Sequence, residues 1–157
     1  MYEPGVVVRR ASEGDLDAVA ELMIRFYRFN EEFDPAWTLG EEDPGRVKEI
    51  LAEYMEKGDL ILVAEVEGRI VGFLRAGVVE NKLLERSRIG LLRELYVKPE
   101  YRRRGIARKL IEEASEELKR RGAQLIAAEF PGLNVVAEDF YRKLGFRLYT
   151  SVFVREV

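Results

Sequence analysis

The chain has 157 residues, 29 acidic and 26 basic, and contains neither cysteine nor histidine. This length predicts one domain, spanning residues 1–157. The two absences exclude disulfides, a thiolate nucleophile, a Ser-His-Asp triad and the usual zinc ligand sets, so we expect no bound metal. Acid–base chemistry then falls to Glu, Asp, Tyr, Lys or water. The net charge of −3 argues against nucleic acid or an anionic membrane as the main partner.

The sequence shows no targeting segment. No apolar run approaches the roughly 18 residues of a transmembrane helix, and residues 1–4 do not resemble the start of a signal peptide. We therefore expect a cytoplasmic protein. The 23 Glu and 19 Arg, against three Asn and one Gln, make a thermophile-like composition.

The first half of the chain predicts a strand, two helices and a hairpin. We expect a strand at 6–8, helices at 16–27 and from 44 to about 57, and strands at 60–66 and 70–79. Ser12 and Asp15 have the spacing of a capping box before the first helix. Asp43 and Pro44 are typical of the start of the second helix. The segment 67–69 contains a glycine and predicts the turn of the hairpin.

The second half predicts alternating strands and helices. We expect strands at 89–97, 125–130 and 146–154, with helices at 105–121 and from 134 to about 144. A strand, helix and strand in succession predict a parallel pair, whereas the earlier hairpin is antiparallel. The fold class is therefore α/β, with a mixed, mostly antiparallel central sheet, about four helices and the order β-α-α-β-β-β-α-β-α-β.

The most informative segment is 94–108, where a strand runs into a turn that opens a helix. The stretch 98–109 carries a net charge of +5, six bases against Glu100, on an acidic chain. The first turn of a helix has about four N–H groups without internal partners and the positive end of the helix dipole, so it binds phosphate readily. Gly105 leaves the backbone open to a ligand. The pattern favours a pyrophosphate site.

Three simpler interpretations compete with this one. The basic residues are also consistent with a solvated helix face, paired with the glutamates that follow. They are consistent with a nucleic-acid patch, although the run is short and lacks exposed aromatic residues. Gly105 alone is consistent with an ordinary turn.

Two motifs resemble those of the GNAT superfamily of N-acetyltransferases. Arg102-x-x-Gly105-x-Ala107, after a strand, is similar to the family's acetyl-CoA motif. Asn134-x-x-Ala137-x-x-x-Tyr141-x-x-x-Gly145-Phe146 is similar to its second cofactor motif. The resemblance covers residues 89–146 and implies a single GNAT-like domain that transfers acetyl groups from acetyl-CoA to amines. A non-catalytic CoA-binding or regulatory module with the same fold is the alternative.

The resemblance also implies which residues hold acetyl-CoA. The pyrophosphate would lie at the helix start, on Arg102, Arg103, Arg104, Gly105, Ile106, Ala107 and Arg108. The pantetheine arm would pair with the strand backbone of Leu95, Tyr96 and Val97, where the family's sheet splays open. Asn134 would contact the cofactor through its amide, although it is equally suited to cap a helix.

The catalytic groups follow from the same resemblance. Tyr141 matches the family's general acid, and the alternative for it is a buried aromatic residue. An N–H on the strand, that of Val97 or a neighbour, would donate to the thioester oxygen. The base is Glu94, Glu129 or a water that one of them orders, and the alternative for both is a solvent-facing strand residue. Direct attack of the amine in a ternary complex needs no enzyme nucleophile.

The acceptor is expected to be an amine on a small molecule or peptide. It would meet the irregular segment 27–37 and the last strand. Glu31, Glu32 and Asp34 favour a cationic acceptor, although an acidic surface loop explains them too. Many family members have two strands after the Gly-Phe pair, whereas only residues 146–157 remain here. An uncovered sheet edge favours a homodimer.

Overall fold

The computed structural model of the protein describes residues 5–157. Its strands are β1 (Val6–Arg10), β2 (Leu60–Val66), β3 (Arg69–Glu80), β4 (Arg88–Val97) and β5 (Leu125–Ala128). Its α-helices are α1 (Leu16–Asn30), α2 (Pro44–Glu56), α3 (Ile106–Arg120) and α4 (Val135–Lys143), joined by short 3₁₀ turns at Glu13–Asp15, Pro35–Trp37 and Pro99–Tyr101. The predicted α/β fold with four helices is confirmed.

The five strands form one sheet in the order β1-β2-β3-β4-β5. The first three pairs are antiparallel and β4–β5 is parallel, as the sequence predicts. At the β2–β3 turn, Glu67 and Gly68 both have positive φ, which matches the right-handed twist of the two strands. The predicted hairpin is confirmed.

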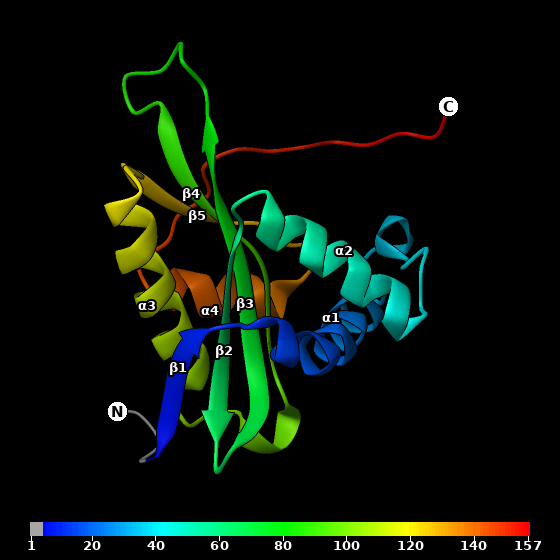
Figure 1. Ribbon diagram of the computed structural model, residues 1–157. Coiled ribbons are helices and arrows are strands. Elements are labelled where there is room, and N and C mark those ends of the chain that lie inside the picture. The colour runs from blue at the N-terminus through cyan, green and yellow to red at the C-terminus, as the bar shows by residue number, and fades with distance from the viewer. Residues whose placement is uncertain (1–4) are drawn as a thin grey trace.

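Helices cover both faces of the sheet (Figure 1). Leu16, Leu51 and Phe73 belong to the core beneath α1 and α2. On the opposite face, Leu110 and Tyr141 belong to the core between the sheet and helices α3 and α4. Each helix buries one apolar stripe, in accordance with the helical spacing of its apolar residues. None of the helices in residues 5–157 combines the length and apolar character that a bilayer-spanning helix needs.

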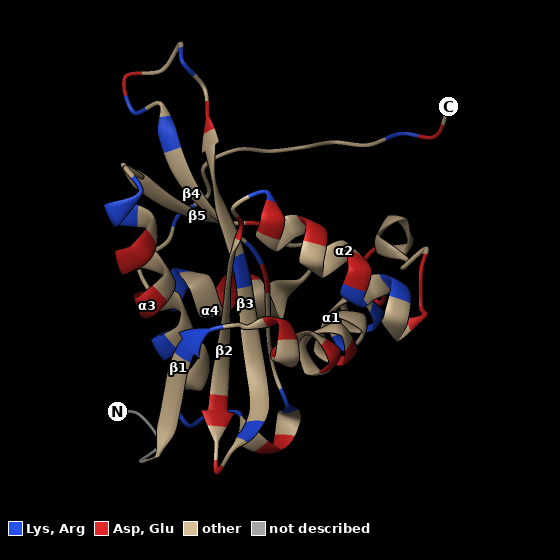
Figure 2. Ribbon diagram, in the orientation of Figure 1, with Lys and Arg blue, Asp and Glu red and all other residues tan. Residues whose placement is uncertain are grey.

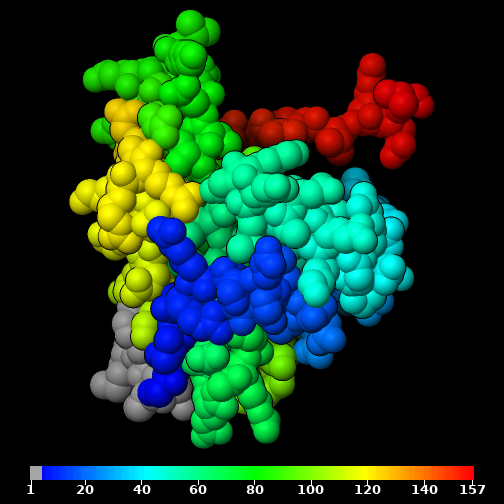
Figure 3. All heavy atoms as spheres, in the orientation of Figure 1, coloured from blue at the N-terminus to red at the C-terminus, as the bar shows by residue number. Residues whose placement is uncertain are grey.

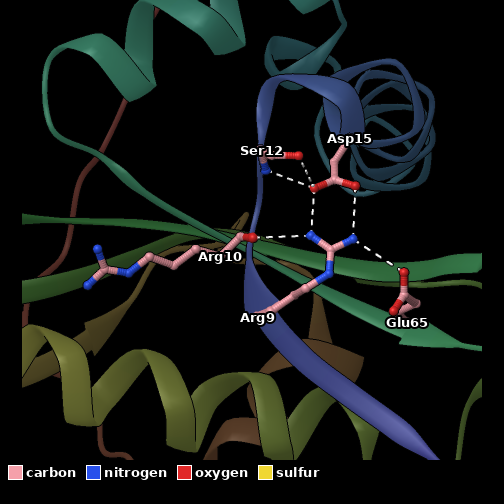
Figure 4. Close-up of polar contacts among 5 residues, drawn as sticks. All are labelled: Arg9, Arg10, Ser12, Asp15 and Glu65. Carbon is pink, nitrogen blue, oxygen red and sulfur yellow. Dashed lines mark hydrogen bonds and ion pairs between the residues drawn. The ribbon is translucent and has the colours of Figure 1, made fainter. Parts of the chain in front are cut away.

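An ionic network holds the start of α1 against the sheet (Figure 4). Arg9 on β1 donates from both terminal nitrogens to Asp15, at 2.7 and 3.0 Å, and also pairs with Glu65 on β2. The Asp15 carboxylate also accepts from the backbone N–H and the hydroxyl of Ser12. The hydrogen bonds from Arg9 hold the pKa of Asp15 well below its usual value. The predicted pairing of Ser12 with Asp15 is thus part of a larger contact.

The predicted last strand at 146–154 is wrong. Residues 146–157 have no strand structure, and after Phe146, which packs against Tyr141, residues 147–157 leave the body of the protein as an extended tail (Figure 1). The residue types favour extended backbone, but a strand also needs a neighbour for its N–H and C=O groups. No strand of residues 5–157 pairs with the tail, so the sheet ends at β5.

Candidate functional site

The N-terminus of α3 presents a row of backbone N–H groups. Among residues 5–157, nothing accepts a hydrogen bond from the N–H groups of Arg103, Gly105, Ile106, Ala107 or Arg108. Arg103 and Gly105 both have left-handed backbone, with φ of 64° and 77°. This combination folds successive N–H groups into a concave nest at the positive end of the helix dipole. The arrangement fits a pyrophosphate, as the sequence predicts for this segment.

The arginine side chains around this nest have different partners. Arg102 donates from Nε to the carbonyl of Val97, at 2.9 Å, and its guanidinium lies over the ring of Tyr96. The guanidinium of Arg104 lies over Tyr101. Arg108 pairs with Glu112 one turn further along α3. Arg102 therefore fixes the turn to the end of β4. Arg108, in contrast, forms an ion pair with Glu112 on the helix surface, as expected if the basic residues only make a solvated helix face.

Beside the nest, β4 and β5 diverge. Their pairing stops at Leu92 and Ala128, so residues 93–97 have no strand on that side. The N–H of Lys98 donates to the carbonyl of Val71 on the neighbouring strand. Because hydrogen-bonded residues alternate along an antiparallel pair, the backbone groups of Leu95 and Val97 face the open side, whereas those of Tyr96 face β3. Of the three residues expected to pair with a pantetheine arm, Leu95 thus presents open backbone and Val97 an open N–H, while the Val97 carbonyl is held by Arg102.

Asn134 caps α4 and is buried. Its Oδ1 accepts from the N–H of Ala137 at 3.0 Å, and its Nδ2 donates to Oδ1 of Asn30 at 2.9 Å. Asn30 is the last residue of α1, is 2% exposed, and donates in turn to the carbonyl of Phe26. The asparagine pair thus ties the end of α1 to the start of α4, a link across 104 residues.

Tyr141 lies on α4, surrounded by aromatic rings. Its ring stacks on Phe130 and meets Phe140 and Phe146 edge-on. No residue of the described chain hydrogen-bonds its hydroxyl. Burial raises the pKa of the Tyr141 phenol well above its usual range, so the hydroxyl keeps its proton and is available as a donor.

Glu94 lies on the other face of the sheet, in a buried ionic cluster. Its carboxylate is 4% exposed and accepts from Arg75 Nε at 2.5 Å and Nη2 at 2.8 Å. The Tyr27 hydroxyl donates to the same carboxylate at 3.1 Å, and Arg75 also donates to Asp59 at 2.7 Å. Tyr54 lies beneath the guanidinium. Glu94 is therefore held in place by partners on both oxygens.

Glu129 is placed differently. It follows β5 directly, and its N–H donates to the carbonyl of Leu92, where the two strands part. Its side chain is half exposed, with Arg93 3.9 Å away as an ion-pair partner. Arg93 is the extra residue of a β-bulge, since Arg75 pairs with Glu94 and Ala76 with Leu92. The bulge lies at the point where the sheet opens.

A cavity of about 370 Å³ lies over the irregular segment after α1. It is lined by Tyr27, Ala36, Trp37, Thr38, Leu39 and Gly40. The Tyr27 and Trp37 rings stack with 6.1 Å between their centres. Because the Tyr27 hydroxyl also reaches Glu94, this cavity and the buried carboxylate share one wall. Trp37, the only tryptophan of the chain, thus lines a candidate acceptor pocket.

A second cavity, of about 570 Å³, lies between α3 and α4. Its lining includes Arg108, Ser115, Lys143 and Phe146. The cavity continues from the nest along α3, and its rim carries both basic and acidic side chains. A molecule longer than a pyrophosphate therefore has room to extend along this helix.

The sequence alone does not identify three residues that contact the predicted site residues, directly or through one another: Arg75, Asp59 and Asn30. Arg75 is a charged residue inside an otherwise apolar predicted strand, and Glu94 lies in the middle of the next predicted strand, beside Arg93. Opposite charges at such positions are a usable signal, because a buried charge needs a partner. Asn30 gives no comparable signal, since its partner lies in a distant segment.

Comparison with known proteins agrees with this geometry. Residues 17–146 match the acetyltransferase (GNAT) family. An uncharacterized N-acetyltransferase of Archaeoglobus fulgidus is 31% identical over 89% of this chain and 92% of its own length. A spermidine N(1)-acetyltransferase of Thermoplasma acidophilum is 26% identical over 91% of this chain and 89% of its own length.

The fold is shared with solved structures. An aminoglycoside N-acetyltransferase, AAC(6')-Iy, solved in complex with CoA, superposes with a TM-score of 0.79 over 96% of this chain and 94% of that chain, at 17% identity. The family match, the archaeal relative and the shared fold agree with the paired motifs. The chain belongs to the GNAT family of acetyltransferases, enzymes that use acetyl-CoA as the acetyl donor.

Proposed function

We propose that the protein, as one domain over residues 1–157, transfers the acetyl group of acetyl-CoA to a primary amine of a cationic acceptor. The observation that carries the proposal is the nest of free N–H groups at α3, next to the open backbone of Leu95 and the open N–H of Val97. Together they offer an anion site and a strand edge in one continuous surface. A long ligand with a pyrophosphate and an amide-bearing arm matches both.

The binding residues divide into two groups. The N–H groups of Arg103 and of residues 105–108 hold the pyrophosphate, and Arg102 fixes the turn that presents them. Arg104 and Arg108 add positive charge around the same point. Asn134 acts mainly as the cap of α4, with one remaining N–H toward the cofactor.

Acetyl-CoA supplies an already activated acetyl thioester, so the amine can attack it directly without an enzyme nucleophile. The N–H of Val97 faces the open side of β4 and serves as the donor to a developing oxyanion. Tyr141 provides the proton for the leaving sulfur, since its hydroxyl is protonated and has no partner within residues 5–157. The proposal therefore uses a ternary complex and no acetylated enzyme.

The two glutamates have separate tasks in this proposal. Glu129 accepts the proton of the amine, directly or through water, because its carboxylate is half exposed where the strands part. Glu94 has partners on both oxygens, which makes it a fixed charge. It positions Tyr27 at the acceptor cavity by accepting from the Tyr27 hydroxyl.

The cationic acceptor is supported by the charge around the cavity. Glu31, Glu32 and Asp34 directly follow α1 and lead into the segment that lines it. Asp34 also caps a short turn by accepting from the N–H of Ala36. The relative in Thermoplasma acidophilum is named for a polyamine, which agrees with an acceptor of this class. We also propose that the protein works as a homodimer in the cytoplasm.

The test is release of free CoA thiol with a panel of amines. The panel contains a polyamine, an aminoglycoside, free lysine, a peptide with a free N-terminus and a neutral primary amine. The proposal expects release with cationic acceptors, and weaker release when Glu31, Glu32 and Asp34 are changed to their amides. Tight CoA binding without release for any amine would instead support the non-catalytic CoA-binding module.

A further inference from the structure

The cavity over the segment between α1 and α2 is lined without any charged side chain. Its lining consists of Tyr27 and residues 36–40, and the largest side chains in it are the two aromatic ones. In Figure 3 this segment lies at the surface, at the right-hand end of the molecule beside α2. A ligand that enters from solvent therefore meets an aromatic pair there, and no carboxylate of the lining.

The two aromatic rings are fixed in place. Tyr27 donates from its hydroxyl to Glu94 at 3.1 Å, and its ring meets the Phe26 ring edge-on. Burial raises the pKa of the Tyr27 phenol well above its usual range, so the hydroxyl remains a donor. The Trp37 ring stacks on Tyr27, with 6.1 Å between the ring centres and 28° between the planes. Tyr27 thus sets the position of the tryptophan ring.

The turn that carries Trp37 is held by local hydrogen bonds. Asp34 accepts from the N–H of Ala36 through its side chain, at 2.9 Å, and from the N–H of Trp37 through its carbonyl, at 3.0 Å. The Thr38 hydroxyl donates to the carbonyl of Pro35 at 2.6 Å. The aromatic surface is therefore preorganised, which lowers the entropy cost of binding a ligand on it.

The lining suits an alkylated cation better than a primary ammonium. A primary ammonium has three N–H donors, and each needs an acceptor once water is removed. The Thr38 hydroxyl already donates to Pro35, and the Glu94 carboxylate behind Tyr27 is already paired with Arg75. An N-alkylated ammonium has fewer donors or none. Its charge is stabilised by the face of an aromatic ring, and tryptophan is the best of these.

Acidic residues flank the cavity in the chain: Glu31, Glu32 and Asp34 before it, and Glu41, Glu42 and Asp43 after it. Figure 2 shows acidic positions on the connection that leads into α2. The Asp34 carboxylate is bonded to the N–H of Ala36, a lining residue, so negative charge reaches the rim. Arg28 offsets one of the other charges by pairing with Glu42. The remaining field favours a cation, and the aromatic pair selects its kind.

We infer that the acceptor carries an N-alkylated cationic nitrogen, besides the primary amine that is acetylated, and that this nitrogen binds on the face of Trp37. Tyr27 and Trp37 are then the residues that determine acceptor specificity. Tyr27 is bonded to Glu94, which directly precedes Leu95 on the open part of β4. An acceptor held at its alkylated end therefore presents its primary amine toward the proposed thioester site. This inference rests on the proposed transfer to a cationic amine and specifies how the cation is recognised.

The first test uses the fluorescence of Trp37, which reports on this cavity because the chain has no other tryptophan. The full chain, with CoA present, is titrated with choline, a quaternary ammonium without a primary amine. Neohexyl alcohol is its neutral isostere, with carbon in place of nitrogen, and sodium chloride matches the ionic strength. The emission should change saturably with choline, and the alcohol should bind roughly 3- to 30-fold more weakly, the range for a cation–π contact. Equal affinities, or no saturable change with choline, would overturn the inference.

The second test compares thiol release with three primary amines of one chain length, whose other ends are a trimethylammonium, an unmethylated ammonium and a tert-butyl group. The value of kcat/KM should be highest for the trimethylated amine. Trp37→Leu keeps an apolar side chain without an aromatic face. It should raise the KM of the trimethylated amine by roughly 3- to 30-fold and leave that of the tert-butyl amine nearly unchanged.

The matched control is Phe33→Leu, which removes an aromatic ring of the same segment outside the lining and should change neither KM. An equal rise of both KM values in the Trp37 variant would leave Trp37 only a packing role and overturn the inference. A preference for the unmethylated amine would overturn it as well.

Thermal unfolding and CoA titration are recorded for both variants. Each is expected to unfold cooperatively and to bind CoA like the natural chain. Choline binding at Trp37 without thiol release for any amine would contradict the proposed function and leave the cation site in place. Thiol release that does not distinguish the trimethylated amine from the tert-butyl amine would contradict the present inference alone.

Discussion

The side-chain amide of Asn134 donates to the side-chain oxygen of Asn30 at 2.9 Å, deep between α1 and α4. One end of this bond starts the helix that carries Tyr141, and the other ends the helix that leads into the candidate acceptor segment. The bond thus connects the two halves of the proposed site through a single buried contact.

Asn30→Ala should reduce both stability and catalysis. It leaves the buried Nδ2 of Asn134 without its partner, which costs about 1–3 kcal/mol in the free energy of unfolding, measured in urea. Exposed Asn81 is the matched control, and its change to Ala should stay within about 0.5 kcal/mol. The KM for acetyl-CoA should rise only in the Asn30 variant. Equal effects of the two substitutions would contradict a linking role for Asn30.

Tyr141→Phe separates catalysis from binding. It removes a hydroxyl without a partner in residues 5–157 and keeps the stacked ring, so stability and CoA affinity should stay nearly unchanged. The value of kcat should fall by about 10²–10⁴, the range for a lost general acid. Tyr149→Phe in the exposed tail is the control. An unchanged kcat would remove Tyr141 from the chemistry.

Arg75 and Glu94 form a buried ion pair, so the losses in unfolding free energy caused by substituting each of them should not be additive. Arg75→Met leaves the Glu94 carboxylate buried without its guanidinium and should cost about 3–5 kcal/mol. Glu94→Leu in the Arg75→Met background should restore most of this loss, as measured by urea unfolding. Additive losses in the double variant would show that the two side chains contribute independently.

Asp15 predicts a pH dependence of stability. Because Arg9 lowers its pKa in the folded state, its contribution is fully present above the unfolded value of about 3.9 and is lost as the pH falls through the folded value. The difference in urea midpoint between the natural chain and Asp15→Asn should therefore be constant from pH 7 to about pH 5 and shrink in more acid solution. A difference that grows in acid would reverse the sign of this linkage.

The two glutamates predict different kinetic effects. Glu129→Gln should lower kcat with little change in the KM for the acceptor, because it removes the proposed base. Glu94→Gln should instead raise the KM for the acceptor and leave kcat nearly unchanged, because it disturbs the position of Tyr27. The opposite pattern in initial-rate assays would exchange the two roles.

Local patterns in the sequence predict much of this fold. The hairpin at Glu67 and Gly68 and the nest at Gly105 each depend on a few adjacent residues, and both are predictable. The tail shows the limit of such patterns. The amino-acid types of the tail favour extended backbone. A strand, however, also needs a second strand to pair with, and the local sequence does not show whether one is present.

Contacts between distant segments are harder to predict. Arg75 and Glu94 meet because of the β3–β4 register, which a bulge at Arg93 shifts by one residue. A one-residue shift reverses the face on which each side chain lies. Asn30 and Asn134 are separated by 104 residues and depend on the packing of two helices. The amino-acid types at these positions are visible in the sequence, but their partners are not.

Initial-rate kinetics of thiol release, with acetyl-CoA and a cationic amine varied together, test the central claim most directly. Direct transfer in a ternary complex predicts reciprocal plots that intersect, and no radiolabel retained on the protein after incubation with labelled acetyl-CoA alone. Parallel lines, together with an acetylated residue recovered from the enzyme, would contradict it.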